Sequence, residues 1–204
     1  SFVEWTNKHC GLPTLKTPQL LEMGSHGWVE FIDQQPCQSA DGVERFYTRL
    51  GILIAVMYLL SGADFHYENV IAHGEFPMPV DLEMLLYPPM APELGESASG
   101  EIDAWQQIAT VFASSLLPFG NREVGGGVDA SYVGAFAIPQ EVKRRRLKYI
   151  NSDFMHWDQE TIVFEPEKSK ATVFLEDELQ RPQDYMRDIL AGFEKAYRFF
   201  LHKK

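Results

Sequence analysis

Cysteine is scarce in this chain of 204 residues, where only Cys10 and Cys37 occur. No Cys-x-x-C pair is present. Small disulfide scaffolds and cysteine-rich zinc sites both need more thiols than this, so neither class fits the chain.

Positive charge is also in short supply. The chain has 18 Lys and Arg against 29 Asp and Glu, which gives a formal net charge of −11. Proteins that bind nucleic acid draw much of their phosphate affinity from Lys and Arg. The sequence therefore argues against a nucleic-acid partner.

Long hydrophobic runs are missing as well. The longest apolar stretch covers residues 50–60, interrupted only by Gly51, and is too short to span a bilayer. The first residues lack the basic start and apolar run of a secretory signal peptide. What the chain does have is 45% hydrophobic and 13% aromatic residues, a composition typical of one globular domain with a sizeable core.

Apolar spacing predicts an α+β domain that is predominantly helical. A long helix at residues 41–60 is apolar nearly all round in its second half, as in a central core helix. A last helix begins near Pro182, a good first-turn residue. Every fourth residue of this last helix is expected in its buried stripe, which comprises Tyr185, Ile189, Phe193, Tyr197 and Leu201.

The other expected elements are shorter. They are the end of a helix at residues 2–8, strands at 15–23 and 28–32 around a turn, a small hairpin of 70–72 with 78–80, and a helix at 101–117. Residues 143–150 fit either a helix or an extended surface segment.

A polar segment after the long helix is the most informative about chemistry. Asp64, His66 and Asn69 form an Asp-x-His-x-x-Asn pattern, and Asp81-x-Glu83 follows after eleven intervening residues, beyond the hairpin. Phosphoryl transfer needs a carboxylate near the attacking hydroxyl, and amide and carboxylate oxygens that hold Mg²⁺ against nucleotide phosphates. The pattern therefore favours a kinase-like site.

Other interpretations of the same segment are weaker. Polar loops often contain Asp, His and Asn simply as turn-forming and capping residues. A zinc site of His66, Glu68 and His73 fits no common zincin spacing. A Ser-His-Asp hydrolase is disfavoured because no Gly-x-Ser-x-Gly elbow occurs.

Short blocks of sequence along the chain carry a more specific signal. They are Trp-Val-Glu-Phe-Ile at 28–32, Pro-Cys at 36–37, Phe-Tyr-Thr-Arg-Leu-Gly at 46–51, Asp-Phe-His-Tyr-Glu-Asn-Val-Ile-Ala-His-Gly at 64–74, Val-Asp-Leu-Glu at 80–83, Ser-Ser-Leu-Leu-Pro at 114–118, Asp-Ala-Ser-Tyr-Val-Gly at 129–134, Ile-Asn-Ser-Asp-Phe-Met at 150–155 and Gly-Phe-Glu-Lys-Ala-Tyr at 192–197. With these blocks in this order, nearly the whole chain resembles the dehydratase domain of class II lanthipeptide synthetases.

The resemblance implies a core similar to that of lipid kinases, which binds ATP and Mg²⁺. It implies phosphorylation of Ser and Thr in a ribosomal precursor peptide, made of leader and core, and then elimination of the phosphate to leave dehydroalanine or dehydrobutyrine. It also implies a separate zinc-containing cyclase domain in the same enzyme, and a place in the bacterial cytoplasm.

Roles for individual residues follow from the same resemblance. Asp64 is the expected acid/base residue beside the substrate hydroxyl, with His66 as its loop partner. Asn69 and Asp81 are expected to hold Mg²⁺ and phosphate, with Glu83 as a further metal ligand.

Two more expected roles lie outside this segment. The strand at 28–32, which includes Glu30 and Ile32, is expected to form the hinge beside adenine and to act mainly through backbone groups. Ser114 stands where the family has a Thr implicated in elimination, so that a hydroxyl is retained.

By this resemblance residues 1–35 are the end of an N-terminal lobe with the hinge. Residues 36–204 are the helical C-terminal lobe of a protein or lipid kinase type, with its catalytic loop at 63–69 and its metal-binding hairpin at 70–83. The family's phosphate-binding Lys block and elimination Arg block do not occur in the sequence. The chain is therefore expected to be a piece of a larger enzyme, partnered by the rest of the N-terminal lobe, with little activity by itself.

Two functional alternatives stay open. A small-molecule or protein kinase with the same loop would stop at the phosphoester, and a non-catalytic kinase-like module would only bind a peptide. The basic cluster at residues 143–148 is expected to be a solvated face, or alternatively a contact for substrate phosphate or an acidic leader peptide.

Overall fold

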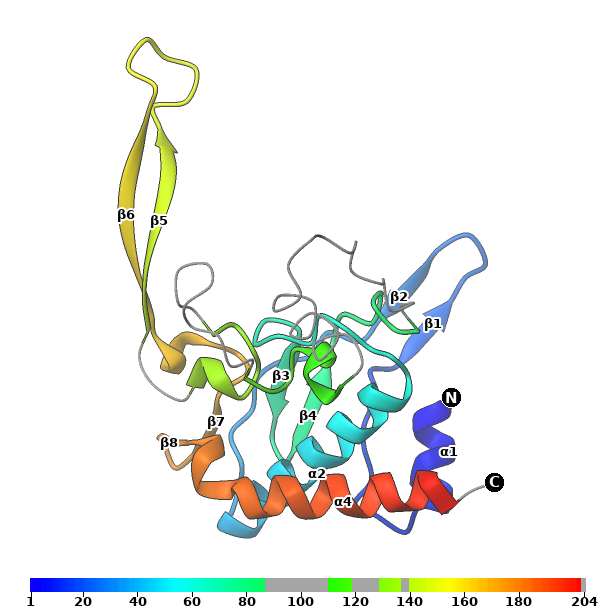
Figure 1. The fold of residues 1–204 in the computed structure, drawn as a ribbon. Helices are drawn as coiled ribbons and strands as arrows, with labels where there is room; N and C mark the ends of the chain where they lie inside the picture. Colours follow the sequence, from blue (N-terminus) through cyan, green and yellow to red (C-terminus); the bar gives the residue numbers. More distant parts are fainter. Residues whose placement is uncertain (87–109, 119–128, 137–139, 203–204) are drawn as a thin grey trace, which may run out of the picture.

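The structure, a computed structural model, describes residues 1–86, 110–118, 129–136 and 140–202 (Figure 1). Most of the helix predicted at 101–117 lies outside these ranges. Its described end is a 3-10 turn, η1 (Val111–Ser114), closed by Ser115 in a left-handed conformation, so an α-helix over these residues was the wrong prediction.

The centre of the domain is α2 (Ala40–Leu59), as the core helix predicted from the sequence. The Ser39 hydroxyl caps its start by accepting a hydrogen bond from Gly42 N at 3.1 Å. Between Phe46 and Met57 every residue except Thr48 is buried. The helix therefore acts as the axis around which the rest of the domain packs.

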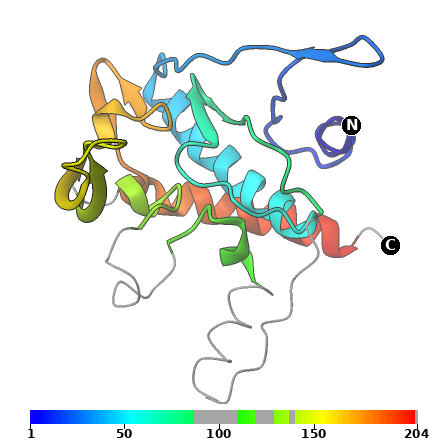
Figure 2. The ribbon, with the colours of Figure 1, turned by 90° about the horizontal axis from the view of Figure 1, so that it is seen from above.

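Helix α4 (Met186–His202) packs against α2 (Figure 2). It follows a 3-10 turn, η4 (Pro182–Tyr185), so the helical segment begins at the predicted proline. Two glycines let the helix backbones touch. A Cβ atom at Gly51 would overlap the Ile189 carbonyl oxygen, and one at Gly192 would overlap the Thr48 carbonyl oxygen.

The predicted stripe of α4 is confirmed in part. Ile189 is buried, whereas Leu201 is 58% exposed, so its assignment to the core was wrong. Gly192 and Ala196 are the buried residues that the four-residue spacing missed. Small residues carry little hydrophobic signal, although they allow the closest helix approach.

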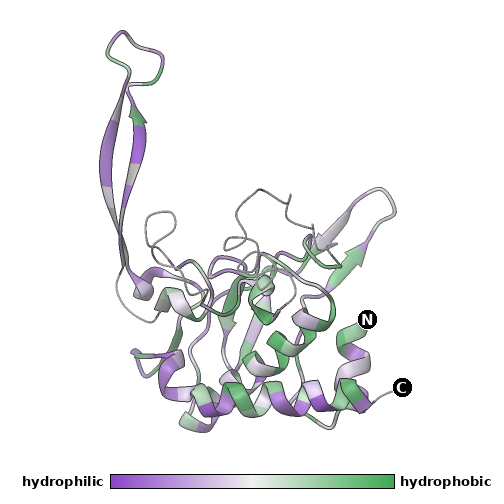
Figure 3. Cartoon of the chain, in the orientation of Figure 1, coloured by the Kyte–Doolittle hydropathy of each residue, from purple (hydrophilic) through white to green (hydrophobic). Residues whose placement is uncertain are grey.

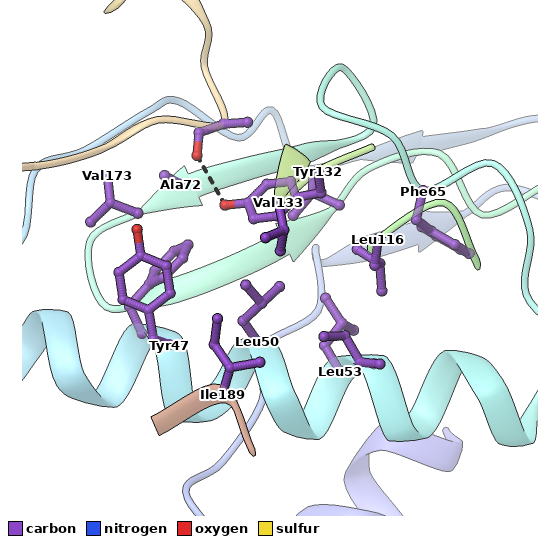
Figure 4. Close-up of a cluster of buried hydrophobic side chains, with 14 of the residues drawn as sticks. Tyr47, Leu50, Leu53, Phe65, Ala72, Leu116, Tyr132, Val133, Val173 and Ile189 are labelled. Carbon is purple, nitrogen blue, oxygen red and sulfur yellow. Dashed lines mark hydrogen bonds between the residues drawn. The ribbon is translucent and has the colours of Figure 1, made fainter. Parts of the chain in front are cut away.

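The main core lies mainly between α2 and the hairpin at residues 70–79 (Figure 4). Tyr47 and Tyr132 are its largest fully buried side chains, and both keep a hydrogen bond. The Tyr132 hydroxyl donates to the Ala171 carbonyl oxygen at 2.9 Å, and the Tyr47 hydroxyl to that of Gln180 at 2.7 Å. The core thus ties together segments more than one hundred residues apart in sequence.

In the described residues all strands pair as separate antiparallel hairpins. The pairs are β1 (Leu20–Glu22) with β2 (Gly27–Val29), β3 (Val70–His73) with β4 (Phe76–Pro79), β5 (Gln140–Lys148) with β6 (His156–Phe164), and β7 (Val173–Leu175) with β8 (Glu178–Gln180). The remaining elements are α1 (Phe2–His9), capped by Ser1, and two 3-10 turns, η2 (Gly134–Phe136) and η3 (Pro166–Lys168).

These hairpins shorten two expected strands and choose between two alternatives that the sequence left open. The two N-terminal strands exist, but they are shorter than 15–23 and 28–32. The segment at 143–150 is extended rather than helical over most of its length, because it lies in β5. The described part of the domain is a mixture of helices and small hairpins, and none of its helices combines the length and hydrophobicity needed to cross a membrane.

An ion-pair network fixes the β3–β4 turn to α2. The guanidinium of Arg49, a buried residue, donates to the Thr14 and Glu75 carbonyl oxygens and lies over the Phe76 ring. The Glu75 carboxylate pairs with both Arg45 and Arg49. Burial alone would raise the pKa of Glu75, but hydrogen bonds and charge from the two arginines hold it below its ordinary value.

Glu75→Gln is expected to loosen the β3–β4 hairpin at neutral pH by about 1–3 kcal/mol, since a charge-assisted pair is lost. Because the pKa of Glu75 is lower in the folded state, its ionised carboxylate stabilises the fold fully above the ordinary value of 4.5. That stabilisation is lost as pH falls through the lower pKa of the folded state. Hydrogen–deuterium exchange of β3–β4 amides should therefore show an acid-induced loss of protection that the variant lacks. The same acid loss in the variant would contradict this assignment.

Candidate functional site

The Asp-x-His-x-x-Asn segment forms a loop between α2 and β3. Phe65 is fully buried and anchors the loop in the core. Phe65 N donates to the Ser114 carbonyl oxygen at 2.8 Å, and Tyr67 N donates to that of Ala130 at 3.3 Å. The alternating residues 64, 66 and 68 are left on the outer side, so the buried ring decides which side chains reach solvent.

Asp64 and His66 face each other on this loop. Asp64 has a left-handed backbone, with φ of 65°, and its side chain is 58% exposed. His66 Nδ1 accepts a hydrogen bond from Glu68 N at 3.1 Å. A neutral His66 therefore carries its proton on Nε2, which lies 3.7 Å from Asp64 Oδ1.

Asn69 closes the loop. Its Nδ2 donates to the Asp64 carbonyl oxygen at 2.9 Å, and its backbone N donates to the His66 carbonyl oxygen at 3.0 Å. No hydrogen bond of the described residues uses Asn69 Oδ1. The amide nitrogen thus fixes the turn, and the amide oxygen is available for a ligand.

The β3–β4 hairpin returns the chain to the same loop. Val80 N donates to the Asn69 carbonyl oxygen at 3.0 Å, so Asp81 follows directly after the residue bonded to Asn69. Asp81 and Glu83 are both exposed, and Glu83 N donates to Asp81 Oδ1 at 3.4 Å. The predicted loop and the predicted carboxylates therefore lie at one edge of the domain. We call this edge the rim and define it by Asp64, His66, Asn69, Asp81 and Glu83.

A family described as "Domain of unknown function (DUF4135)" matches residues 1–204. The chain belongs to the DUF4135 family. Among curated proteins, "Lacticin 481/lactococcin biosynthesis protein LcnDR2" of Lactococcus lactis subsp. lactis is 30% identical over 188 residues. That match covers 90% of this chain and 20% of the relative, so the DUF4135 chain spans about a fifth of the length of that protein.

The rim of the DUF4135 domain fits a magnesium ion by its donor chemistry. Mg²⁺ prefers oxygen ligands and keeps several waters, so one amide oxygen and one carboxylate suffice. Asn69 Oδ1 and the Asp81 carboxylate offer those atoms. No three His, Cys, Asp or Glu side chains gather as a metal site within the described ranges.

The zinc alternative also fails on position. His73 lies at the far end of β3 from the loop, and its Nδ1 is bonded to the Asp33 carbonyl oxygen at 2.9 Å. The structure therefore separates His73 from His66, the other histidine of the zinc alternative.

Ser114 occupies a structural position in this DUF4135 domain. Its side chain is buried, donates from Oγ to the Val111 carbonyl oxygen at 2.7 Å and accepts from Leu116 N at 3.3 Å. The hydroxyl is thus engaged within its own turn. Its backbone oxygen is what contacts the Asp-x-His-x-x-Asn loop, at Phe65 N.

Glu30 and Ile32 lie on the N-terminal hairpin and its exit. Glu30 N donates to the Gln19 carbonyl oxygen at 2.8 Å, so this backbone donor is used within the hairpin. Ile32 is buried against Ile71 and Met78 of the β3–β4 hairpin. This contact joins the expected hinge to the expected metal-binding hairpin.

A cleft beside the loop was not anticipated from the sequence. It has a volume of about 530 Å³ and brings the loop residues Tyr67 and Glu68 next to a segment about one hundred residues later. Its other lining residues are Val163, Glu165, Lys168, Ser169 and Lys170. No local pattern could reveal it, because its two sides meet only in the folded domain.

Cys37 has a packing role. Its buried thiol donates to the Gly74 carbonyl oxygen at 3.2 Å, and burial raises its pKa to about 11. A thiol with this pKa is protonated at neutral pH and is a poor nucleophile.

Proposed function

We propose that this domain is the catalytic part of an ATP- and Mg²⁺-dependent dehydratase that modifies Ser and Thr of a precursor peptide in lanthipeptide biosynthesis. The observation that carries the proposal is the pair of hydrogen bonds that Asn69 makes at the rim. Its side-chain amide donates to the Asp64 carbonyl oxygen, and its own carbonyl oxygen accepts from Val80 N, the residue before Asp81. The name of the Lactococcus relative, a lacticin 481/lactococcin biosynthesis protein, supports the choice of pathway.

The first chemical step uses Asp64. A substrate hydroxyl gives its proton to the Asp64 carboxylate as the hydroxyl oxygen forms a bond to the γ-phosphorus of ATP, and the bond to the ADP oxygen breaks. Asp64 is exposed and can receive a substrate, and the Asn69 amide holds its backbone in the left-handed conformation. His66 Nε2–H faces the same carboxylate and orients it.

Asn69 Oδ1 and Asp81 would hold Mg²⁺ at this rim. The ion, when bound, neutralises charge on the nucleotide phosphates. The domain's own contribution is to fix the two oxygens relative to Asp64, which it does through the β3–β4 register. Glu83, two residues after Asp81, is a candidate for an additional oxygen ligand.

The second step is elimination from the phosphorylated residue. A base takes the Cα proton, the electron pair forms the Cα–Cβ double bond, and the Cβ–O bond breaks as phosphate leaves. Asp64, once it has released the proton of the first step to solvent, is the group of this rim that can accept the Cα proton, because the Nδ1 lone pair of neutral His66 is engaged by Glu68 N. Ser114 is assigned no part in the step because its hydroxyl is buried and bonded within its turn.

The N-terminal hairpin supports a larger assembly around this domain. Every residue of β1 and β2 is exposed, although Leu20, Leu21 and Trp28 are large apolar side chains. A lone two-stranded hairpin with apolar residues on both faces is not stable in water. We therefore assign residues 1–35 to the edge of an N-terminal lobe and residues 36–204 to a kinase-like C-terminal lobe, with a cyclase domain in the same bacterial cytoplasmic enzyme.

Asp81→Asn in the enzyme that contains this domain is expected to lower precursor phosphorylation by about 10²-fold at ordinary Mg²⁺, since a charged oxygen ligand becomes neutral. Raising the Mg²⁺ concentration should recover part of the rate. Asp177→Asn is the matched control, because Asp177 is exposed, far along the chain and has a φ of 64° that Asn also tolerates. Equal rates for Asp81→Asn and the control at every Mg²⁺ concentration would remove Asp81 from the site.

A further inference from the structure

The β5–β6 hairpin forms an arm that projects from the rest of the domain (Figure 1). Its nine-residue strands pair along their whole length. Most residues of the two strands are hydrophilic (Figure 3). Side chains alternate between the two faces of such a ribbon, and directly paired residues share a face. Leu147 therefore lies on the same face as its partner Trp157, and Arg145 as its partner Gln159.

The two faces of the arm differ in how their charges are used. On one face Arg146 pairs with Glu160, Nη1 to Oε2 at 3.4 Å, and Lys148 pairs with Asp158, Nζ to Oδ2 at 2.6 Å. These cations are already neutralised by the neighbouring strand. Neither Arg146 nor Lys148 needs a further partner of opposite charge.

The other face carries cations without carboxylate partners. We call it the docking face and define it by Lys143, Arg145, Leu147, Trp157 and Val163. Lys143 and Arg145 are exposed and make no ion pair within the described residues, and Arg145 lies over the Trp157 ring at 5.6 Å. Trp157 is 59% exposed, and Glu141 at the base is the single carboxylate on this face.

The docking face leads directly to the candidate site. Val163, at the base of the arm, lines the same cleft as Tyr67 and Glu68. Those two residues lie between His66 and Asn69 in the catalytic loop. The docking face and the loop of the proposed site therefore border the same cleft.

We propose that the docking face binds an acidic, extended segment of the peptide substrate and guides its Ser or Thr into the cleft beside Asp64. This inference rests on the proposed function and adds to it where the peptide is recognised. Lys143 and Arg145 are two residues apart on a strand, about 6.7 Å along it. An extended peptide repeats with the same spacing, so alternate carboxylates of the substrate can pair with the two cations while an apolar side chain covers Trp157.

The test is a binding measurement without ATP on the enzyme that contains this domain. The probe is a fluorescein-labelled synthetic peptide in which Glu alternates with Thr, and fluorescence anisotropy gives its Kd. Lys143→Gln with Arg145→Gln removes two positive charges from the docking face. Arg146→Gln with Lys148→Gln removes two from the opposite face and serves as the matched control.

The docking-face pair is expected to weaken binding by about threefold to tenfold, and the control pair by less than about twofold. A probe with Lys in place of Glu should not bind. Hydrogen exchange of β5–β6 amides shows whether each variant keeps the arm. Equal weakening by both pairs, or by neither, in variants that keep the arm overturns the inference.

Phosphorylation of a precursor peptide, assayed separately in the wild-type enzyme, keeps the two proposals apart. If the enzyme phosphorylates the peptide but the docking-face variant binds the probe as the control does, the proposed function stands and this inference is wrong. An enzyme that binds the acidic probe on the docking face but never phosphorylates loses the proposed function.

Discussion

Asp64→Asn is expected to lower precursor phosphorylation by about 10²- to 10⁴-fold in the enzyme that contains this domain, the range typical of a lost general base. Asn matches Asp in size and also tolerates a left-handed backbone, so φ of 65° is not a reason for misfolding. Asn cannot accept the hydroxyl proton. The loss should therefore appear in kcat, with the KM for ATP little changed.

Asp177→Asn is again the control for this experiment. Asp177 is exposed in the β7–β8 turn at a φ of 64°, which matches Asp64 in residue type, exposure and backbone conformation. Intact-mass spectrometry of the peptide over time gives both rates. If Asp64→Asn keeps the rate of the control, Asp64 is not the group that accepts the proton.

Gly51→Ala and Gly192→Ala are expected to produce the largest loss of stability. Each new Cβ would overlap a backbone carbonyl oxygen of the facing helix, and backbone cannot rotate away as a side chain can. Separating α2 from α4 would uncover Ile189 and Ala196, so we expect a cost of at least about 3 kcal/mol. Hydrogen exchange of α2 and α4 amides measures this cost within the whole enzyme.

Gly42→Ala provides the comparison on the same helix. The tightest contact of its Cβ would be the Ser39 hydroxyl at 3.3 Å, and the Arg45 and Cys37 side chains would lie at an ordinary 3.8 Å. Ala also favours a helix over Gly, so the net change should stay within about 1 kcal/mol. Protection that falls equally in Gly42→Ala and Gly192→Ala would show that helix contact at Gly192 is not the cause.

The features that the sequence revealed are those with strong local patterns. Helix α2 was found because apolar residues surround its second half, and β3–β4 because two short apolar runs flank a turn around Gly74. The rim could be anticipated for the same reason. The loop and the carboxylates are separated by eleven intervening residues, and one hairpin spans that interval.

The features that were missed depend on contacts between distant segments. The basic run in β5 has no alternating apolar pattern, and its pairing with β6 appears only in the fold. The buried position of Ser114 depends on the Asp-x-His-x-x-Asn loop that packs against its turn. The cleft joins Tyr67 to Lys170, and the 58% exposure of Leu201 is set by how α4 packs in the folded domain.

The most direct measurement is intact-mass spectrometry of a precursor peptide incubated with the enzyme that contains this domain, ATP and Mg²⁺. The proposed function predicts a phosphorylated peptide that is converted, one site after another, into a peptide that has lost water. A stable phosphopeptide would contradict elimination and indicate a kinase. An unchanged mass, with the peptide still bound, would contradict catalysis and indicate a binding module.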